Sequence, residues 1–464
     1  MKALFLSILA LLPAAASAQR DTLGVLERSS VFSAEDERAV AGFHTESPAM
    51  MLYRSEQSLS QISLRIDLRR EQEALLQPLG DGAFDGGFYA ESYRRLSERS
   101  ATWADARYVR GNRRNVCWNS TADYLLLYPC ITADSAGGNL STEEYAFGGG
   151  YVHRVGRFDL AIRGDYRAGQ EYRQVDPRPH NVVSDFTIKL GVGMQFPQYV
   201  LGLDLQGRLY KQDQDIDFFY PPGASSSELY MTGLGSYYTR YSLNSESFNI
   251  GYDGKGCLLA AQLMPRHAKG WYARAAFESL TTERLNKSNN TVPITRLKTR
   301  QATLSAAYRS GRWSLRAGGG YELRRSIEMI ADRTGHSVIV DEQAMYKNRI
   351  WHADAEATVE WRRGTVNYML SPRAEWRLSG TADAACAVLR SGTRQRRMAP
   401  SAVARESDGR NRLLRLARRG GFAQQRAEQH FGIPDLHGGA AERPGRLPRG
   451  VPAGRTPPEP ESGL

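Results

Sequence analysis

Few residues of this sequence have the types and spacing that catalysis or metal binding requires. Its eight histidines are scattered, and none lies in an HExxH or other metal-ligand spacing. The sequence has neither a G-x-S-x-G nucleophile turn nor a phosphate-binding loop. Asp354 and Glu356 stand two positions apart, within the separations that glycosidases use. On a strand, however, we expect them to be solvated or paired with arginine. We therefore predict no enzyme and no catalytic, cofactor-binding or metal-binding residue.

Two short segments are weaker candidates for ligand contact or for a disulfide. The segment 176–179 (Asp-Pro-Arg-Pro) is expected in a connection, where it would present Arg178 and, next to it, His180 to a ligand. The alternative is a stiff loop whose arginine pairs with a neighbouring carboxylate. Cys117 and Cys130 are close enough in sequence to close one loop by a disulfide, and two unpaired thiols are the alternative.

The elements that carry these residues are predicted by strict alternation of apolar and polar side chains. Phe158, Leu160 and Ile162 fall on one face of a strand, whereas Asp159 and Arg163 fall on the other. The same pattern recurs in the segments 62–69, 185–196, 199–209, 313–324 and 352–361. Runs of about 10 to 12 residues are long for a soluble strand but match the roughly 9–11 residues of a tilted membrane-spanning strand.

Connections and aromatic residues support the same fold. Short turns near 154–157, 197–198 and 310–312 alternate with long polar connections near 169–184 and 325–349, as in outer-membrane barrels. Aromatic residues cluster at the ends of the runs, where a barrel places its interfacial girdles. We predict an all-β protein, an antiparallel transmembrane β-barrel, with roughly 13 to 15 strands before Gly380. Between Leu209 and Pro265 one or three strands are required, and three is favoured.

The N-terminus has the pattern of an export signal. Lys2 precedes the apolar run 3–12, and a small-residue cleavage site ends at Ala18. We therefore predict a signal peptide over 1–18, a segment of unclear structure over 19–45, and the barrel over 46–380.

The composition changes abruptly after Gly380. Residues 381–464 contain 15 Arg, no Lys and 8 acidic residues, and only two of the chain's 45 aromatic residues. One explanation is a disordered basic tail. The other, which we favour, is translation out of frame from near Gly380, in which case the barrel lacks its last strands in this chain. Either way the net charge of +11 comes mainly from this tail, and we expect no nucleic-acid partner.

One region indicates a family. The segments 118–124 (Trp-Asn-Ser-Thr-Ala-Asp-Tyr), 127–129 (Leu-Tyr-Pro), 132–134, 144–151 and 172–185 together resemble an uncharacterised outer-membrane β-barrel family of Bacteroidota, a numbered family of unknown function. The resemblance covers about residues 45–378. It departs from the family at Cys130, where an aromatic residue is expected, and in the whole tail. The resemblance implies a barrel of about 14–18 strands in the intact family form and a bacterial outer-membrane location, but no known activity.

These observations lead to a general function hypothesis. Closely spaced charges of both signs on the interior face predict arginine–carboxylate ladders and a narrow or packed interior. We expect passage or binding of a small or hydrophobic solute, with outer-membrane lipid and the barrel-assembly machinery as partners. The alternatives are a structural or adhesive surface barrel and a secreted, carbohydrate-binding β protein.

Overall fold

The computed structural model describes residues 40, 42–219, 228–238, 247–267, 269–287, 292–331, 339–363, 366–383 and 390–406. The predicted cleavage site at Ala18 lies outside these residues, as does Cys386, one of the four cysteines of the sequence. In this part of the chain, no helix has the length and hydropathy needed to cross a membrane.

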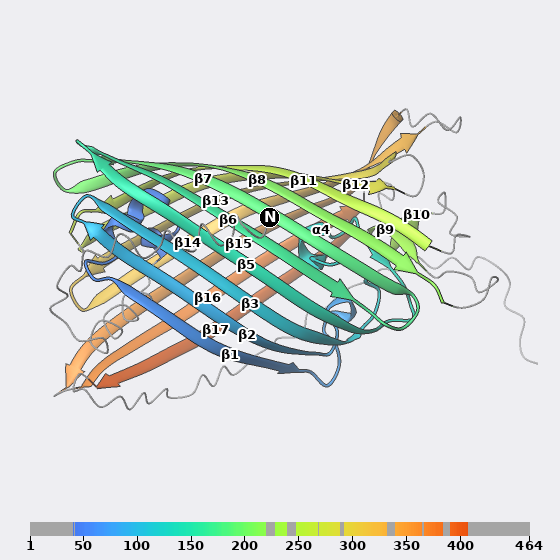
Figure 1. Ribbon diagram of the computed structural model, residues 1–464, viewed down its shortest axis with the longest axis horizontal. Coiled ribbons are helices and arrows are strands. Elements are labelled where there is room, and N and C mark those ends of the chain that lie inside the picture. The colour runs from blue at the N-terminus through green and yellow to red at the C-terminus, as the bar shows by residue number, and fades with distance from the viewer. Residues whose placement is uncertain are drawn as a thin grey trace, which may run out of the picture. The chain divides into compact units, whose positions relative to one another are not determined.

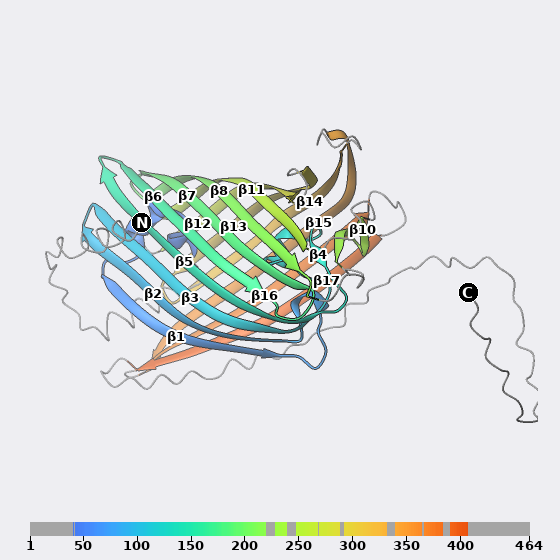
Figure 2. The same cartoon turned by 45° about the vertical axis from the view of Figure 1, so that its right-hand side comes forward.

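One large antiparallel sheet dominates the protein (Figure 1). In the described residues its 14 strands follow one another in chain order, each paired with the next. They are β1 (Leu59–Arg70), β2 (Gly82–Ser97), β3 (Ser100–Val116), β5 (Gly138–Val155), β6 (Phe158–Tyr172), β7 (Arg178–Gln195), β8 (Tyr199–Asp217), β11 (Ser247–Pro265), β12 (Gly270–Asn286), β13 (Val292–Ser310), β14 (Trp313–Ala331), β15 (Ile339–Arg363), β16 (Val366–Asp383) and β17 (Arg390–Glu406). The sheet rolls up, so that β2–β8 face β11–β16 across an interior (Figures 1 and 2). The predicted all-β, antiparallel barrel architecture is confirmed.

The two faces of the rolled sheet have opposite chemistry. Large apolar side chains on its outer face are exposed; examples are Leu64 (81%), Leu160 (47%) and Leu205 (56%). Their charged neighbours turn inward, and Asp159 and Asp204 are buried. A water-soluble sheet would bury its apolar face, so this arrangement is that of a sheet surrounded by lipid.

The connections alternate as predicted, but the strands are longer. Turns of two to four residues close one end of the sheet, as at Gly156–Arg157 between β5 and β6, and longer connections lie at the other end. Most strands have 15 to 19 residues because polar extensions continue the pairing beyond the apolar band. We call these the short-turn end and the long-connection end.

The region between β8 and β12 corrects one prediction. Among the described residues of this region, β11 alone joins the large sheet, so the favoured count of three barrel strands is not found there. Two further strands, β9 (Leu229–Gly233) and β10 (Ser236–Tyr238), form a separate three-stranded sheet with β4 (Thr132–Ala133). Short alternating runs cannot by themselves reveal which sheet they join, because pairing is decided by distant strands.

The predicted disordered tail also needs correction, over Arg390–Glu406. These residues form β17, which pairs with β16 along its length, from Arg390 opposite Ala382 to Glu406 opposite Val366. Backbone hydrogen bonds to an edge strand require no side-chain alternation, which is why the composition did not reveal this strand. No pairing of β17 with β1 occurs among the described residues. The favoured frame shift remains a prediction.

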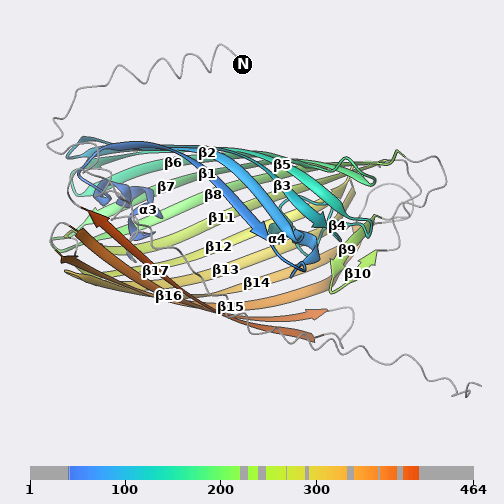
Figure 3. The same cartoon turned by 90° about the horizontal axis from the view of Figure 1, so that it is seen from below.

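Chain segments pack inside the sheet near both of its ends. At the short-turn end, α3 (Gly42–Thr45) and the 3-10 helix η1 (Pro48–Tyr53) lie against the inner faces of β3, β5–β8 and β12 (Figure 3). At the long-connection end, α4 (Tyr124–Leu127), η2 (Gln77–Leu79) and the three-stranded sheet are found. Leu127, Ile131 and Tyr230 of these segments form an apolar cluster with Tyr210 and Tyr252 of the barrel wall.

Candidate functional site

The interior face carries a ladder of arginine–carboxylate pairs, as the alternation predicts. Arg163 on β6 contacts Asp165 at 2.6 Å and Asp105 of β3 at 2.8 Å. Arg208 on β8 makes a two-pronged contact with Asp185 of β7, at 2.9 and 2.8 Å. Pairs that join different strands hold the wall together and place charges of both signs along it.

Asp354, one of the two paired acids of the sequence, belongs to the same ladder. It lies 3.7 Å from Arg316 of the neighbouring strand. Its role is therefore that of an arginine-paired interior residue, as expected.

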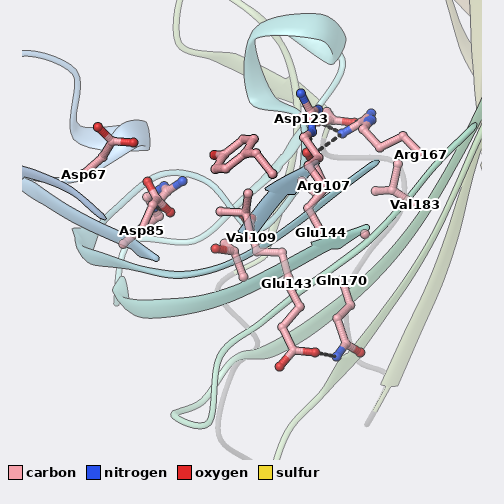
Figure 4. A pocket seen from close by; sticks show the side chains of 16 residues that line it. Asp67, Asp85, Arg107, Val109, Asp123, Glu143, Glu144, Arg167, Gln170 and Val183 are labelled. Atoms are coloured by element: carbon pink, nitrogen blue, oxygen red, sulfur yellow. Dashed lines mark hydrogen bonds and ion pairs between the residues drawn. The ribbon is translucent and has the colours of Figure 1, made fainter. Parts of the chain in front are cut away.

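A cavity of about 370 Å³ opens among these charges near the long-connection end (Figure 4). Its walls come from β1, β2, β3, β5, β6 and β7 and from the segment before α4. The charged residues that line it are Asp67, Asp85, Asp123, Glu143, Glu144, Glu171, Arg107, Arg113 and Arg167. Six acidic side chains against three arginines give the lining an excess of acidic groups, which favours cations over anions.

Arg167 is the centre of the charge network in this cavity. Its guanidinium contacts both carboxylate oxygens of Asp123, at 3.0 and 2.5 Å, and approaches Glu144 and Asp185 at 3.4 Å each. The Tyr210 hydroxyl donates a further hydrogen bond to Asp123 at 3.0 Å. Asp123 has a left-handed backbone conformation (φ 52°) immediately before α4, which turns its side chain toward the wall.

A second polar cluster is buried behind α4. Arg173 and Asp134 form an ion pair of 2.6 Å in which both side chains are fully buried. The Ser120 hydroxyl lies 3.0 Å from Asp134 and 2.6 Å from Glu228, the residue before β9. Burial away from water, with Asp134 nearby, raises the pKa of the Glu228 carboxyl to about 8. Glu228 is therefore protonated at neutral pH and can share the cluster with Asp134.

The N-terminal segment is fixed to the interior by polar contacts. Ser47 donates a hydrogen bond to Asp204 of β8 at 2.6 Å, and Tyr53 donates one to Asp159 of β6 at 2.5 Å. Glu46 pairs with Arg274 of β12 at 2.8 Å. Because these partners belong to three separate wall strands, the segment spans the interior at the short-turn end.

Neither of the two loop residues predicted from the sequence lines the cavity. Arg178 is the first residue of β7 and His180 the third, so the prediction that Arg178 lies in a connection is wrong. Arg178 contacts Asp176 at 2.7 Å and stacks on Phe219, as in the alternative interpretation. His180 packs edge-on against Tyr172. The pairing with β8 extends the strand this far because Arg178 lies opposite Asp217.

The two cysteines near one another in sequence are free thiols. Cys130 is buried, with its Sγ 3.0 Å from the Ser326 hydroxyl, whereas the Cys117 Sγ donates to the Ser135 carbonyl at 3.3 Å. The alternative of two unpaired thiols is the one the structure adopts. Among the described residues, no group of three or more metal-ligating side chains occurs.

Sequence reasoning did not single out the two acids that organise the long-connection end. Asp123 lies inside the segment 118–124 that carries the family resemblance, so its position there was the available signal. No sequence signal marked Glu228, because it follows a polar connection and its partner Ser120 lies 108 residues away in the chain.

Similarity to known proteins gives a family and a set of barrel structures. A FadL homologue of Pseudomonas aeruginosa has 12% identity over 73% of this chain and 85% of its own, with a TM-score of 0.38. The unliganded ferric citrate transporter FecA has 11% identity over 75% of this chain and 60% of its own, with a TM-score of 0.37. The monoaromatic hydrocarbon channel CymD has 10% identity over 79% of this chain and 92% of its own, with a TM-score of 0.33. None of the curated proteins matches the chain.

The family match covers most of the chain. A model described as a family of unknown function, DUF6850, matches residues 48–424, which include the barrel and reach beyond β17. The resemblance to a numbered family of unknown function is thus confirmed in that respect, and the chain belongs to the DUF6850 family.

Proposed function

We propose that this protein is an outer-membrane β-barrel that takes up small polar solutes, cations in particular, into its interior at the long-connection end. The observation that carries the proposal is the cavity of about 370 Å³, whose six carboxylates exceed its three arginines. The exposed apolar outer face supports the membrane location. Arginine–carboxylate pairs along the inner wall favour a polar solute over a hydrophobic one, because an apolar molecule would gain little from contact with them.

Ion selectivity in planar bilayers tests this function. With a KCl gradient across the bilayer, we expect the reversal potential to show a preference for potassium over chloride. Asp67 and Glu171 line the cavity, so the double variant D67N/E171Q should lower this preference. D217N is the matched control, because Asp217 lies at the exposed end of β8 and does not line the cavity.

Two results would refute the proposal. The first is preference for chloride in the wild-type protein. The second is absence of both conductance and swelling of liposomes by small polar solutes. That second result would favour the structural or adhesive surface barrel. In such a protein the chain segments inside both ends would close the interior to solutes.

A further inference from the structure

The outer face of β11–β15 carries an unusual row of cations. Cross-strand pairing places Lys255 opposite Thr281, Thr281 opposite Lys298, Lys298 opposite Arg325, and Arg325 opposite Lys347. Four of the five positions in this row are basic. Figure 3 shows the five strands side by side.

The next row toward the short-turn end adds two more cations. It consists of Cys257, Ser279, Arg300, Leu323 and Arg349, paired in that order. The two rows together hold six basic residues and no acidic one in ten positions. We call Lys255, Lys298, Arg300, Arg325, Lys347 and Arg349 the basic strip.

The side chains of the basic strip are available for binding. Lys255, Arg300, Arg325 and Arg349 are exposed, and the other two are half-buried. Within the described part of the chain, no carboxylate forms a salt bridge with any of the six. The interior arginines behave differently, since Arg163, Arg167 and Arg208 each contact one or more carboxylates.

This arrangement is unfavourable unless an anion lies across it. Like charges directly opposite one another on neighbouring strands destabilise a sheet. Lys298, Arg325 and Lys347 are three such positions in succession. Neighbouring strands are about 4.8 Å apart, so the three cations extend over about 10 Å. A group with more than one phosphate fits this length and charge.

The position of the basic strip indicates where that anion comes from. The row beyond Arg300 and Arg349, toward the short-turn end, contains Phe277, Tyr321 and Trp351, and the last two rings lie 4.5 Å apart. A second set of aromatic residues on the same strands, Trp271, Tyr308 and Trp313, lies near the short turns. Aromatic girdles mark the two membrane interfaces, so the basic strip lies at headgroup level on the long-connection side.

We infer that the basic strip binds the headgroup of a membrane lipid that carries more than one phosphate. This inference rests on the membrane location in the proposed function but not on solute passage. It assigns the outer face of β11–β15 a specific lipid contact, in addition to the apolar band below it.

Native mass spectrometry of the detergent-solubilised full-length protein tests the inference. The probes are cardiolipin, with two phosphates, phosphatidylglycerol, with one, and phosphatidylcholine, with no net charge. We expect binding to decrease in that order. Each basic residue near an anionic lipid contributes about five-fold, so K298Q/R325Q/K347Q should weaken cardiolipin binding about 100-fold.

Matched controls separate the basic strip from general surface charge. The triple variant R110Q/R114Q/K211Q removes three cations from β3 and β8, outside the basic strip, and should change cardiolipin binding less than about three-fold. Equal binding of the three lipids, or an equal effect of the two triple variants, would overturn the inference. Pyrophosphate that binds as tightly as cardiolipin would also overturn it, because the source would then be a soluble phosphate.

Failure here is distinguishable from failure of the proposed function. K298Q/R325Q/K347Q should retain the wild-type potassium preference in bilayers, because the basic strip and the cavity lie on opposite faces of the sheet. Heat-modifiable migration on gels checks that the variant is folded. Wild-type lipid binding without conductance would refute solute passage alone.

Discussion

At the residue scale, Arg167 is the side chain on which the interior network depends most. It contacts Asp123, Glu144 and Asp185, and each acid has one further partner: Tyr210, Arg107 and Arg208, respectively. In R167M the three carboxylates would repel one another in a partly buried site. We expect the free energy of unfolding to fall by roughly 2 kcal/mol, less than for a fully buried pair.

Urea denaturation, followed by loss of the compact gel band, measures this change. R373M is the control, because Arg373 pairs with Glu375 where both side chains are exposed, and its loss should lower the free energy of unfolding by less than about 0.5 kcal/mol. Equal destabilisation by the two variants would show that Arg167 is not a hub of the network.

Glu228 should make the segment around β9 sensitive to pH. In the folded segment its carboxyl keeps its proton until about pH 8, whereas after opening it titrates near 4.5, the ordinary pKa of a glutamate. The open state therefore binds fewer protons between these values, and stability is lost as pH rises through that window. The loss is at most about 1.4 kcal/mol per pH unit, and stability is greatest at or below pH 4.5.

Hydrogen exchange of Leu229–Gly233, corrected for the intrinsic effect of pH, reports this opening. E228Q should remove the dependence between pH 4.5 and 8. D341N, which changes an exposed acid on β15, should leave it intact. A dependence that persists in E228Q would assign it to another group.

At the element scale, the N-terminal segment 42–53 is held by contact with wall glycines. A Cβ atom at Gly191 would lie 2.8 Å from Pro48 Cγ and 3.0 Å from the Ala49 backbone nitrogen. Added atoms at so tight a contact cost roughly 1–3 kcal/mol. G191A should therefore displace η1 from the inner wall without changing the segment itself.

Trypsin cleavage after Arg54 measures that displacement. We expect cleavage in G191A to be about ten-fold faster than in the wild-type protein, since a roughly 1–3 kcal/mol shift multiplies the open population accordingly. G164A is the matched control on β6, because a Cβ at Gly164 has no atom within 4 Å. Similar rates for the two variants would contradict the tight contact at Gly191.

At the scale of the whole molecule, the rolled 14-stranded sheet predicts the behaviour of a membrane barrel. The protein should extract from the membrane fraction with detergent and migrate faster on SDS gels when unboiled than when boiled. Fourteen paired strands resist SDS cooperatively because most of the polar backbone is bonded within the sheet. An unboiled sample without the shift, recovered in the soluble fraction, would instead support a secreted β protein.

The sequence by itself determined the chemistry of the two sheet faces. Successive strand residues point to opposite sides. Leu160 and Asp159 therefore had to lie on opposite faces of the sheet, whatever the arrangement of the strands. The same alternation, with its short turns, determined the order and antiparallel pairing of most strands. It also implied that interior charges would pair.

Only the tertiary structure decided which charges meet and which segments enter the interior. Arg167 reaches Asp123 across 44 residues, and Ser47 reaches Asp204 across 157. These contacts depend on how the sheet rolls and on where the connections fold back. Neither feature produces a periodic pattern in the sequence. The basic strip has the same origin, because Lys298, Arg325 and Lys347 become one row only through the register of three strands. Local alternation is a property of one strand, whereas sites are made between strands.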